Sequence, residues 1–267
     1  GYVPGEELDD EYTSYVVDAN GYVQKNTTYE RWDGTYMFDA NGKGVEGFRT
    51  VNGRKCYFER GCMQKGSTFR IGDTYYVAAA DGTVTTLSSN GWNQVDGSWY
   101  YMDNGKLIRS SRFEINGKTY VFNYKGKMIS EEAIWTNGSY DEEVIYGAAK
   151  DGTMLKNTWK RVKMYTQKEG GYTAYGWAYF DENGQAVKGI QTINGKKYYF
   201  NSGMRFMATN SMVKAEDGTL YIAGSDGVLK TANRNGWTQV DGKWYYTVNG
   251  VGAENCIRKI DNAYYAF

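Results

Sequence analysis

The sequence predicts an all-β fold, a solenoid of stacked β-hairpins in which each hairpin covers a face of the next. Three observations predict it. The chain of 267 residues contains 34 glycines, 26 tyrosines and one proline, which is typical of short strands joined by tight turns. Asn-Gly and Asp-Gly turns recur, and an aromatic strand follows each of them. The turns return about every 20 residues, a period that indicates a repeat architecture.

Each expected hairpin has a two-residue turn whose central residues need positive φ, which Asn-Gly and Asp-Gly adopt readily. A Val or Ile precedes each of these turns. The full pattern occurs in "TVNGRKCYF" (50–58), "QVDGSWYY" (94–101), "EINGKTYVF" (114–122), "TINGKKYYF" (192–200) and "QVDGKWYY" (239–246), with weaker versions in "RIGDTYYV" (70–77) and "KIDNAYYAF" (259–267). A second turn, such as "DANG" or "DENG", usually follows the aromatic strand.

The repeats are themselves duplicated. The stretch "GWNQVDGSWYY" (91–101) returns as "GWTQVDGKWYY" (236–246). We therefore expect an acidic N-terminal segment (1–11), a first hairpin block (12–131) and a second hairpin block (132–267). A lone hairpin is not stable in water, so each must bury a face on its neighbours.

The second block is longer than the first by an insertion of eleven residues. It predicts an elongated hairpin near 160–177 that turns at "KEGG" (168–171) and carries Trp177. An insertion in one repeat of an array often marks a binding face. A tolerated surface insertion is the alternative.

Side chains alternate across a strand, so the two faces of each aromatic strand follow from counting after the turn glycine. The third and fifth positions are almost uniformly apolar or aromatic and are predicted to form the core. The second and fourth positions face the other way and should be at least partly exposed. Trp occupies the second position only in the two copies of the quoted motif. The predicted core column is Cys56 and Phe58, Tyr100 and Met102, Tyr120 and Phe122, Tyr198 and Phe200, Tyr265 and Phe267; the outward column is Lys55 and Tyr57, Trp99 and Tyr101, Thr119 and Val121, Lys197 and Tyr199, Trp244 and Tyr246.

The composition argues against several classes of function. Basic and acidic residues balance at 31 each, which disfavours a nucleic-acid footprint or a polybasic membrane patch. No apolar run approaches the ~18 residues that span a bilayer. Because histidine is absent, Ser-His-Asp and Cys-His nucleophile systems and His-bearing metal sites are excluded. The densest acidic stretch, 131–143, lies where the two blocks join and is explained as a solvated connection. We expect no catalytic residues, no metal and no cofactor.

The chain has three cysteines, Cys56, Cys62 and Cys256. The odd count and the absence of metal spacing support neither a disulfide framework nor zinc. Cys56 and Cys62 stand where the other block has packing residues, which favours buried free thiols. A Cys56–Cys62 bridge in an oxidising compartment is the alternative.

The repeated motif consists of Gly-Trp, a spacer, Asp/Asn-Gly, a Trp-Tyr-Tyr-like strand and a second Gly turn, and it extends over nearly the whole chain. It resembles the cell-wall-binding repeats of Gram-positive surface proteins. That group includes choline-binding repeats, the glucan-binding repeats of glucansucrases and the repetitive oligopeptide region of clostridial toxins. The resemblance implies a secreted or cell-surface protein whose partner is a polysaccharide or glycan of its own cell wall, of a host or of the diet.

The resemblance implies a choline site in the form of an aromatic cage. The outward pair of one hairpin and the Trp of the next Gly-Trp would make up this cage. Quaternary ammonium needs such a cage because ring faces supply its counter-charge. Here Arg112 follows the first outward pair at that position and Ile257 follows the second. A guanidinium repels a bound cation and an isoleucine supplies no ring, so choline is disfavoured.

Flat aromatic rings beside polar side chains suit stacking on a sugar, whose C–H face is apolar and whose hydroxyl groups need hydrogen bonds. The predicted function is a non-catalytic carbohydrate-binding or cell-wall-binding module. A protein-binding adhesin or a rigid spacer without a glycan ligand is the alternative. Packing between hairpins is the favoured role of Trp92 and Trp237, whereas packing and binding are both open for the outward rings. The candidate ligand-binding residues are Trp92, Trp99, Tyr101, Arg112, Trp177, Trp237, Trp244 and Tyr246.

Overall fold

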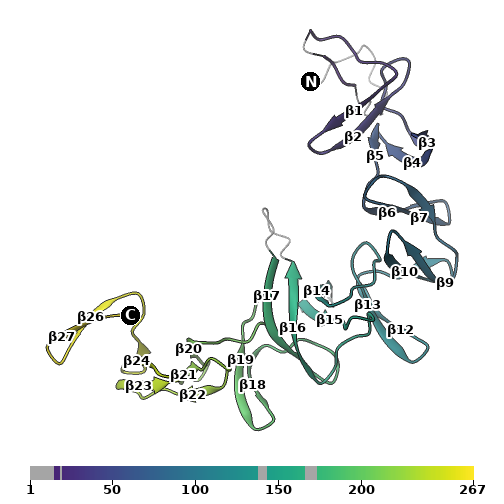
Figure 1. Ribbon diagram of the computed structural model, residues 1–267. Coiled ribbons are helices and arrows are strands. Elements are labelled where there is room, and N and C mark those ends of the chain that lie inside the picture. The colour runs from purple at the N-terminus through teal and green to yellow at the C-terminus, as the bar shows by residue number, and fades with distance from the viewer. Residues whose placement is uncertain (1–14, 19, 138–142, 166–172) are drawn as a thin grey trace. The chain divides into compact units, whose positions relative to one another are not determined.

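The computed structural model describes residues 15–18, 20–137, 143–165 and 173–267, and there the chain forms strands and turns without a helix (Figure 1). The predicted all-β architecture of successive hairpins is confirmed. Within these ranges no helical segment exists that could cross a membrane. The predicted acidic segment 1–11 and the turn at 168–171 lie outside the described residues.

The chain divides into two compact units, Gly1–Ser111 with Phe122–Met128, and Arg112–Val121 with Ile129–Phe267. The block boundaries at 131 and 132 remain a prediction. The first unit contains β1 (Thr27–Arg31), β2 (Gly34–Phe38), β3 (Gly47–Val51), β4 (Arg54–Glu59), β5 (Cys62–Met63), β6 (Ser67–Ile71), β7 (Thr74–Ala78), β8 (Val84–Thr86), β9 (Gly91–Val95), β10 (Ser98–Asp103) and β11 (Lys106–Leu107). The unit boundary falls within the hairpin of β12 (Ser111–Ile115) and β13 (Lys118–Phe122).

The second unit continues with the same kind of element. Its strands are β14 (Glu132–Asn137), β15 (Glu143–Gly147), β16 (Thr158–Tyr165), β17 (Thr173–Phe180), β18 (Gly189–Ile193), β19 (Lys196–Phe200), β20 (Ser211–Lys214), β21 (Leu220–Ala223), β22 (Leu229–Thr231), β23 (Gly236–Val240), β24 (Lys243–Val248), β25 (Val251–Gly252), β26 (Ile257–Ile260) and β27 (Ala263–Ala266). The strands of each hairpin pair antiparallel, and β14 also pairs with β16 in parallel, in the order β15-β14-β16-β17. Strands β16 and β17, where the sequence predicts an elongated hairpin, have eight residues each and pair antiparallel.

The two-residue turns have the predicted conformation. The Asn or Asp residue has φ between 47° and 51°, and the following glycine has φ between 68° and 78°. These pairs are Asn52-Gly53, Asp96-Gly97, Asn116-Gly117, Asn194-Gly195 and Asp241-Gly242. In the second turns, Asp39 Oδ1 accepts hydrogen bonds from the backbone N–H groups of Asn41 and Lys43, at 2.8 and 2.9 Å. The turn aspartates therefore have the structural role that their sequence position indicates.

The core follows the predicted column in most hairpins. Its fifth-position residues Phe58, Met102, Phe122 and Phe200 are almost fully buried. All three cysteines are free thiols; Cys56 is fully buried, as expected, whereas Cys62, also expected to be buried, is half-buried.

Two residues depart from the face assignment. Val121, predicted to be at least partly exposed, is fully buried because it packs against Ile129, Tyr146 and Ala148. Tyr265, predicted to be core, is 40% exposed. Its ring contacts Trp237 of the preceding hairpin, with centroids 5.0 Å apart. The face of a strand alone therefore does not decide burial; the neighbouring hairpin does.

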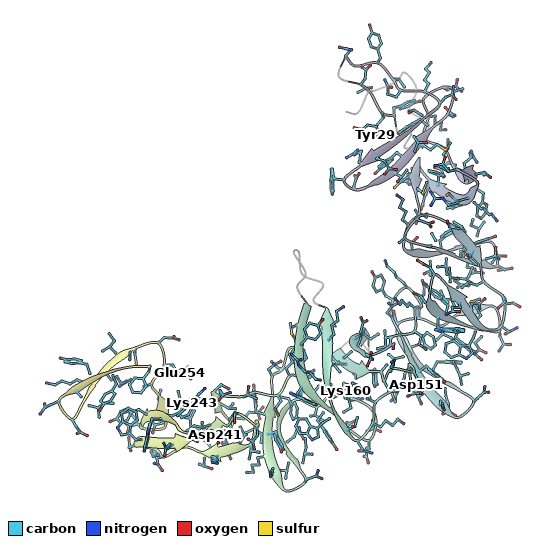
Figure 2. The ribbon with its side chains drawn as sticks, in the orientation of Figure 1. Tyr29, Asp151, Lys160, Asp241, Lys243 and Glu254 are labelled. Carbon is cyan, nitrogen blue, oxygen red and sulfur yellow. The ribbon has the colours of Figure 1, made fainter. Side chains whose placement is uncertain are left out.

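Polar links between successive hairpins supplement the apolar contacts. Arg54 Nη1 of β4 donates to Asp81 Oδ2, 2.8 Å away in the turn after β7. Hydrogen bonds from the backbone N–H and hydroxyl of Thr83, together with Arg54, lower the pKa of the Asp81 carboxyl to about 2. Asp241, at the tip of the β23–β24 hairpin (Figure 2), accepts hydrogen bonds from the Ser225 N–H and hydroxyl at 2.6 and 2.8 Å. These bonds lower its pKa too.

Replacing the buried Phe58 or Phe200 by alanine should lower the free energy of unfolding by ~3–5 kcal/mol, because each leaves a cavity where a full ring was buried. Chemical denaturation followed by circular dichroism measures the change. Tyr264→Ala is the control, since 73% of that side chain is exposed. A loss for Tyr264→Ala equal to that for Phe58→Ala would contradict the assignment of the core.

Candidate functional site

A cluster of rings joins the β9–β10 hairpin to the end of β13. Trp92 on β9 lies opposite Tyr101 on β10, and their ring centroids are 5.1 Å apart at 67°. On its other side Trp92 contacts Phe122, at 5.9 Å and 31°. Trp99, two residues before Tyr101, meets Trp92 edge to face at 6.0 Å. It remains 40% exposed, so the cluster presents one outward indole to solvent.

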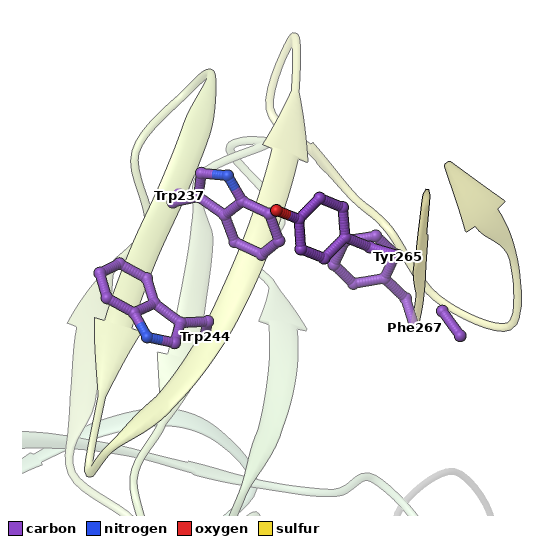
Figure 3. Close-up of a pocket in the computed structure, with 5 residues that line it drawn as sticks. Trp237, Trp244, Tyr265 and Phe267 are labelled. Atoms are coloured by element: carbon purple, nitrogen blue, oxygen red, sulfur yellow. The ribbon is translucent and has the colours of Figure 1, made fainter. Parts of the chain in front are cut away.

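The same cluster recurs at β23–β24 (Figure 3). Trp237 contacts its cross-strand neighbour Tyr246 at 4.9 Å, and the next hairpin supplies Tyr265 at 5.0 Å and Phe267 at 5.7 Å. Trp244 meets Trp237 edge to face at 6.3 Å and is 58% exposed. A shallow pocket of about 480 Å³ lies between these rings, lined by Trp237, Trp244, Tyr265, Ala266 and Phe267.

The elongated hairpin carries a third copy of the cluster. Trp159 on β16 lies opposite Tyr179 on β17, with ring centroids 5.4 Å apart. The next hairpin supplies Tyr198 at 4.9 Å and Phe200 at 5.5 Å. Trp177 stands two residues before Tyr179, as the outward Trp does in the other two copies, and is 48% exposed.

A backbone hydrogen bond supports this equivalence. The carbonyl of Trp177 accepts from Met207 N–H at 2.7 Å, and the carbonyl of Trp99 accepts from Met128 N–H at 2.7 Å. The expectation that only Trp99 and Trp244 occupy this position is therefore wrong. Counting from the turn glycine missed the third copy because the longer strands of this hairpin move the turn away from Trp177.

The eight predicted site residues thus fall into different surroundings. The outward rings are Trp99, Trp177 and Trp244, and they are exposed. Trp92 and Trp237 are half-buried between two hairpins, which fits the packing role favoured for them. Tyr101 and Tyr246 are half-buried beneath these tryptophans. The part of these residues in ligand binding stays a prediction.

Arg112 contacts residues of its own unit, and Ile257 does not form the cage wall expected from the sequence. The Arg112 guanidinium lies 5.1 Å over the Tyr146 ring, and its Nη1 donates to the carbonyl of Asn183 at 2.9 Å. Ile257 on β26 is 73% exposed and does not line the pocket beside Trp244. Tyr265 and Phe267 complete the lining of the pocket beside Trp237 and Trp244, because the following strand β27, rather than β26, faces the pocket.

Two other hairpins, β3–β4 and β18–β19, have a lysine at the position of the outward Trp. At β3–β4 four rings contact in a closed circuit: Phe48 with Tyr57, Tyr57 with Phe69, Phe69 with Tyr76, and Tyr76 with Phe48, at 4.7 to 5.4 Å. Lys55 Nζ lies 4.1 Å from the Phe48 centroid and 5.7 Å from that of Tyr76. At the β18–β19 hairpin, the Lys197 Nζ likewise lies 5.6 Å over Tyr221. A cation of the chain itself thus covers the ring face that an outward Trp would leave open.

The family model described as "Putative cell wall binding repeat" matches residues 90–105, 191–203 and 235–249. These segments comprise the β9–β10 hairpin, most of the β18–β19 hairpin and the β23–β24 hairpin. These three segments of the chain therefore match the cell wall binding repeat, which confirms the predicted resemblance. The third cluster, on β16 and β17, lies outside the matched segments.

Among curated proteins, the chain is 31% identical over 229 residues to "Glucosyltransferase-S" of Streptococcus mutans serotype c, across 85% of this chain and 14% of that protein. It is 28% identical over 224 residues to "Glucosyltransferase-S" of Streptococcus downei, across 78% of this chain and 15% of that protein. The chain thus spans about a seventh of the length of these relatives.

Among solved structures, the chain is similar to choline binding protein F from Streptococcus pneumoniae. The identity is 19%, the TM-score is 0.37, and the match covers 85% of this chain and 93% of that one. It is also similar to an alternansucrase in complex with isomaltononaose, at 20% identity and a TM-score of 0.34, across 96% of this chain and 23% of that one.

Replacing Trp237 by alanine should destabilise the protein far more than replacing Trp244. Trp237 is packed between two hairpins, so its loss should cost about 2–4 kcal/mol, somewhat below the cost for a fully buried aromatic residue. Trp244→Ala should cost less than about 1 kcal/mol, as exposed substitutions usually do. Denaturation midpoints measure both. Equal losses would mean that Trp244 is a packing residue as well.

Proposed function

We propose that this array of cell wall binding repeats is a non-catalytic carbohydrate-binding module of a secreted or surface protein. The observation that carries the proposal is the recurring cluster with one outward Trp. Trp99, Trp177 and Trp244 are 40%, 48% and 58% exposed, although large apolar rings are otherwise favoured in the core. Each stands on a hairpin held by buried rings, which presents a flat apolar face in a fixed orientation.

A sugar is the ligand that suits this surface. Its C–H face stacks on an indole, and its hydroxyl groups need hydrogen-bonding partners nearby. Gln94 lies directly opposite Trp99, and Gln239 lies opposite Trp244. Each amide offers both a donor and an acceptor on the same face as the ring. The two platforms therefore combine stacking with neutral hydrogen bonding.

Choline suits the same surface less well. The faces of Trp237, Tyr246, Tyr265 and Phe267 are already in contact with one another, at 4.9 to 6.5 Å. A quaternary ammonium is held best when several ring faces surround it. Trp244 offers one open indole beside a shallow pocket, which suits the apolar C–H face of a sugar ring.

The module binds and does not catalyse. The sequence has no histidine, and the described residues include no group of three or more potential metal ligands. Similarity to parts of proteins named glucosyltransferases fits a binding region that accompanies a catalytic one. The partner is a polysaccharide or glycan of the bacterial cell wall, of a host or of the diet, and the site of action is the outside of a Gram-positive cell.

Trp99→Ala and Trp244→Ala should each weaken binding to wall polysaccharide several-fold, because one stacking platform is lost. The double variant should lose more than the two single losses predict, since linked sites bind a polymer with avidity. Binding isotherms on isolated cell wall and on soluble glucan measure both effects. Tyr264→Ala is the matched control, an exposed ring outside the clusters, and should bind as the wild type does.

Unchanged binding in the double Trp variant, with the fold intact, would rule out the platforms. The adhesin or spacer alternative would then stand, with the rings serving only to join hairpins. A glycan array run on the wild-type chain separates these two, because a spacer without a ligand should bind no glycan on it.

Choline at millimolar concentration should not raise the melting temperature. A ligand of the folded state at 100 times its Kd adds ~2.7 kcal/mol, so even modest affinity would be visible. Differential scanning fluorimetry with choline and with a glucan oligosaccharide makes the comparison. A clear shift with choline alone would show that the ring clusters act as cation cages.

A further inference from the structure

The third platform differs from the other two in the residue opposite its outward Trp. In the β16–β17 register, Arg161 lies directly opposite Trp177. The corresponding residues of the other two clusters are Gln94 and Gln239. A neutral amide is thus replaced by a guanidinium on the same face as the stacking ring.

The longer strands extend this face beyond Trp177. Tyr175 follows at the next outward position, is 59% exposed and pairs with Lys163. The Arg161 guanidinium carbon lies 5.7 Å from the Tyr175 ring centroid. Rings and cations therefore lie side by side along one face of the hairpin.

The charges on this face are not equivalent. Lys163 Nζ lies 3.7 Å from Glu132 Oε1, so its charge is partly balanced. Within the part of the chain that the structure describes, Arg161 forms no ion pair, and its side chain is exposed. The N–H donors of its guanidinium group are therefore available to a ligand.

The opposite face of the hairpin is closed. Val162 and Ala178 are each 1% exposed in the core of this unit. A Cβ added to Gly176 would overlap the ring of Phe206, so Phe206 lies directly against the backbone there. Beside Trp177, in the described part of the hairpin, a ligand therefore reaches the face that carries Trp177, Tyr175 and Arg161, while the core covers the other face.

We propose that this face binds an acidic polysaccharide, with a sugar ring stacked on Trp177 and the carboxylate or phosphate group of the sugar against Arg161. The inference rests on the carbohydrate-binding function proposed above and assigns a ligand class to one of its platforms. A guanidinium binds carboxylate and phosphate with two parallel hydrogen bonds. The platforms with Gln94 and Gln239 have no such charge opposite the ring and bind neutral sugars. The array thus carries two specificities.

The test compares dextran, carboxymethyl-dextran and phosphorylated dextran of matched length on the full chain. Arg161→Gln converts the third platform to the residue that the others have. It should weaken binding of the anionic polymers about tenfold, the size expected for a hydrogen bond to a charged group, and leave dextran binding unchanged. Added salt should abolish the difference between wild type and variant, because exposed charges are screened. Whichever anionic polymer loses more affinity identifies the acidic group.

Lys160→Gln is the matched control, because it removes the same charge from the opposite face of the same strand. Its binding to all three polymers should equal that of the wild type. In the reverse experiment, Gln239→Arg should add affinity for the anionic polymers at the Trp244 platform. Equal losses for Arg161→Gln and Lys160→Gln, or no preference of the wild type for either anionic polymer, would overturn the proposal.

Failure of the underlying function gives a different result. If no polymer bound, and Trp99→Ala and Trp244→Ala changed nothing, the carbohydrate-binding function itself would be wrong and this inference with it. Dextran binding that depends on Trp99 and Trp244, together with an unaltered anionic preference in Arg161→Gln, would overturn only the present inference.

Discussion

The structure depends on one ring contact that is repeated along the chain. An aromatic residue on the first strand of a hairpin packs against the tyrosine opposite it and against rings of the next hairpin. Phe48, Trp92, Trp159 and Trp237 all occupy this position. Two short strands cannot bury both of their faces, so without this contact neighbouring hairpins would have little apolar surface in common.

This contact also fixes where ligands can bind. The residue two positions before the tyrosine lies at the edge of the same cluster. Its identity decides whether the ring cluster of that hairpin is exposed to solvent or covered. Lys55 and Lys197 cover ring faces with a cation of the chain itself. Trp99, Trp177 and Trp244 leave an indole exposed instead. Binding sites can therefore be gained or lost at single positions without disturbing the core, and several sites on one array bind a polymer with avidity.

The sequence was sufficient wherever structure is decided locally. Asn-Gly and Asp-Gly predicted the turns because positive φ restricts the choice of residue, and alternation predicted the burial of Phe58 and Phe200. The sequence was insufficient where contacts with a neighbouring hairpin determine the burial or the position of a side chain. Val121 is buried by contacts that its own strand does not show. The cluster around Trp177 was missed because its equivalence to Trp99 lies in cross-strand register, which the inserted residues separate from the turn signal.

The inserted residues have a further consequence, because a hairpin lengthened at its tip keeps its base unchanged. Trp159 and Tyr179 make the same contacts as their counterparts, while the extra cross-strand pairs project beyond the region that the next hairpin covers. Tyr175, in one of these extra pairs, is consequently free of the packing constraint that holds Trp159, whereas Arg161 stands where the other two clusters have a glutamine. A repeat array can thus acquire a new specificity at the outer part of one hairpin while the ring contact that joins the hairpins stays the same.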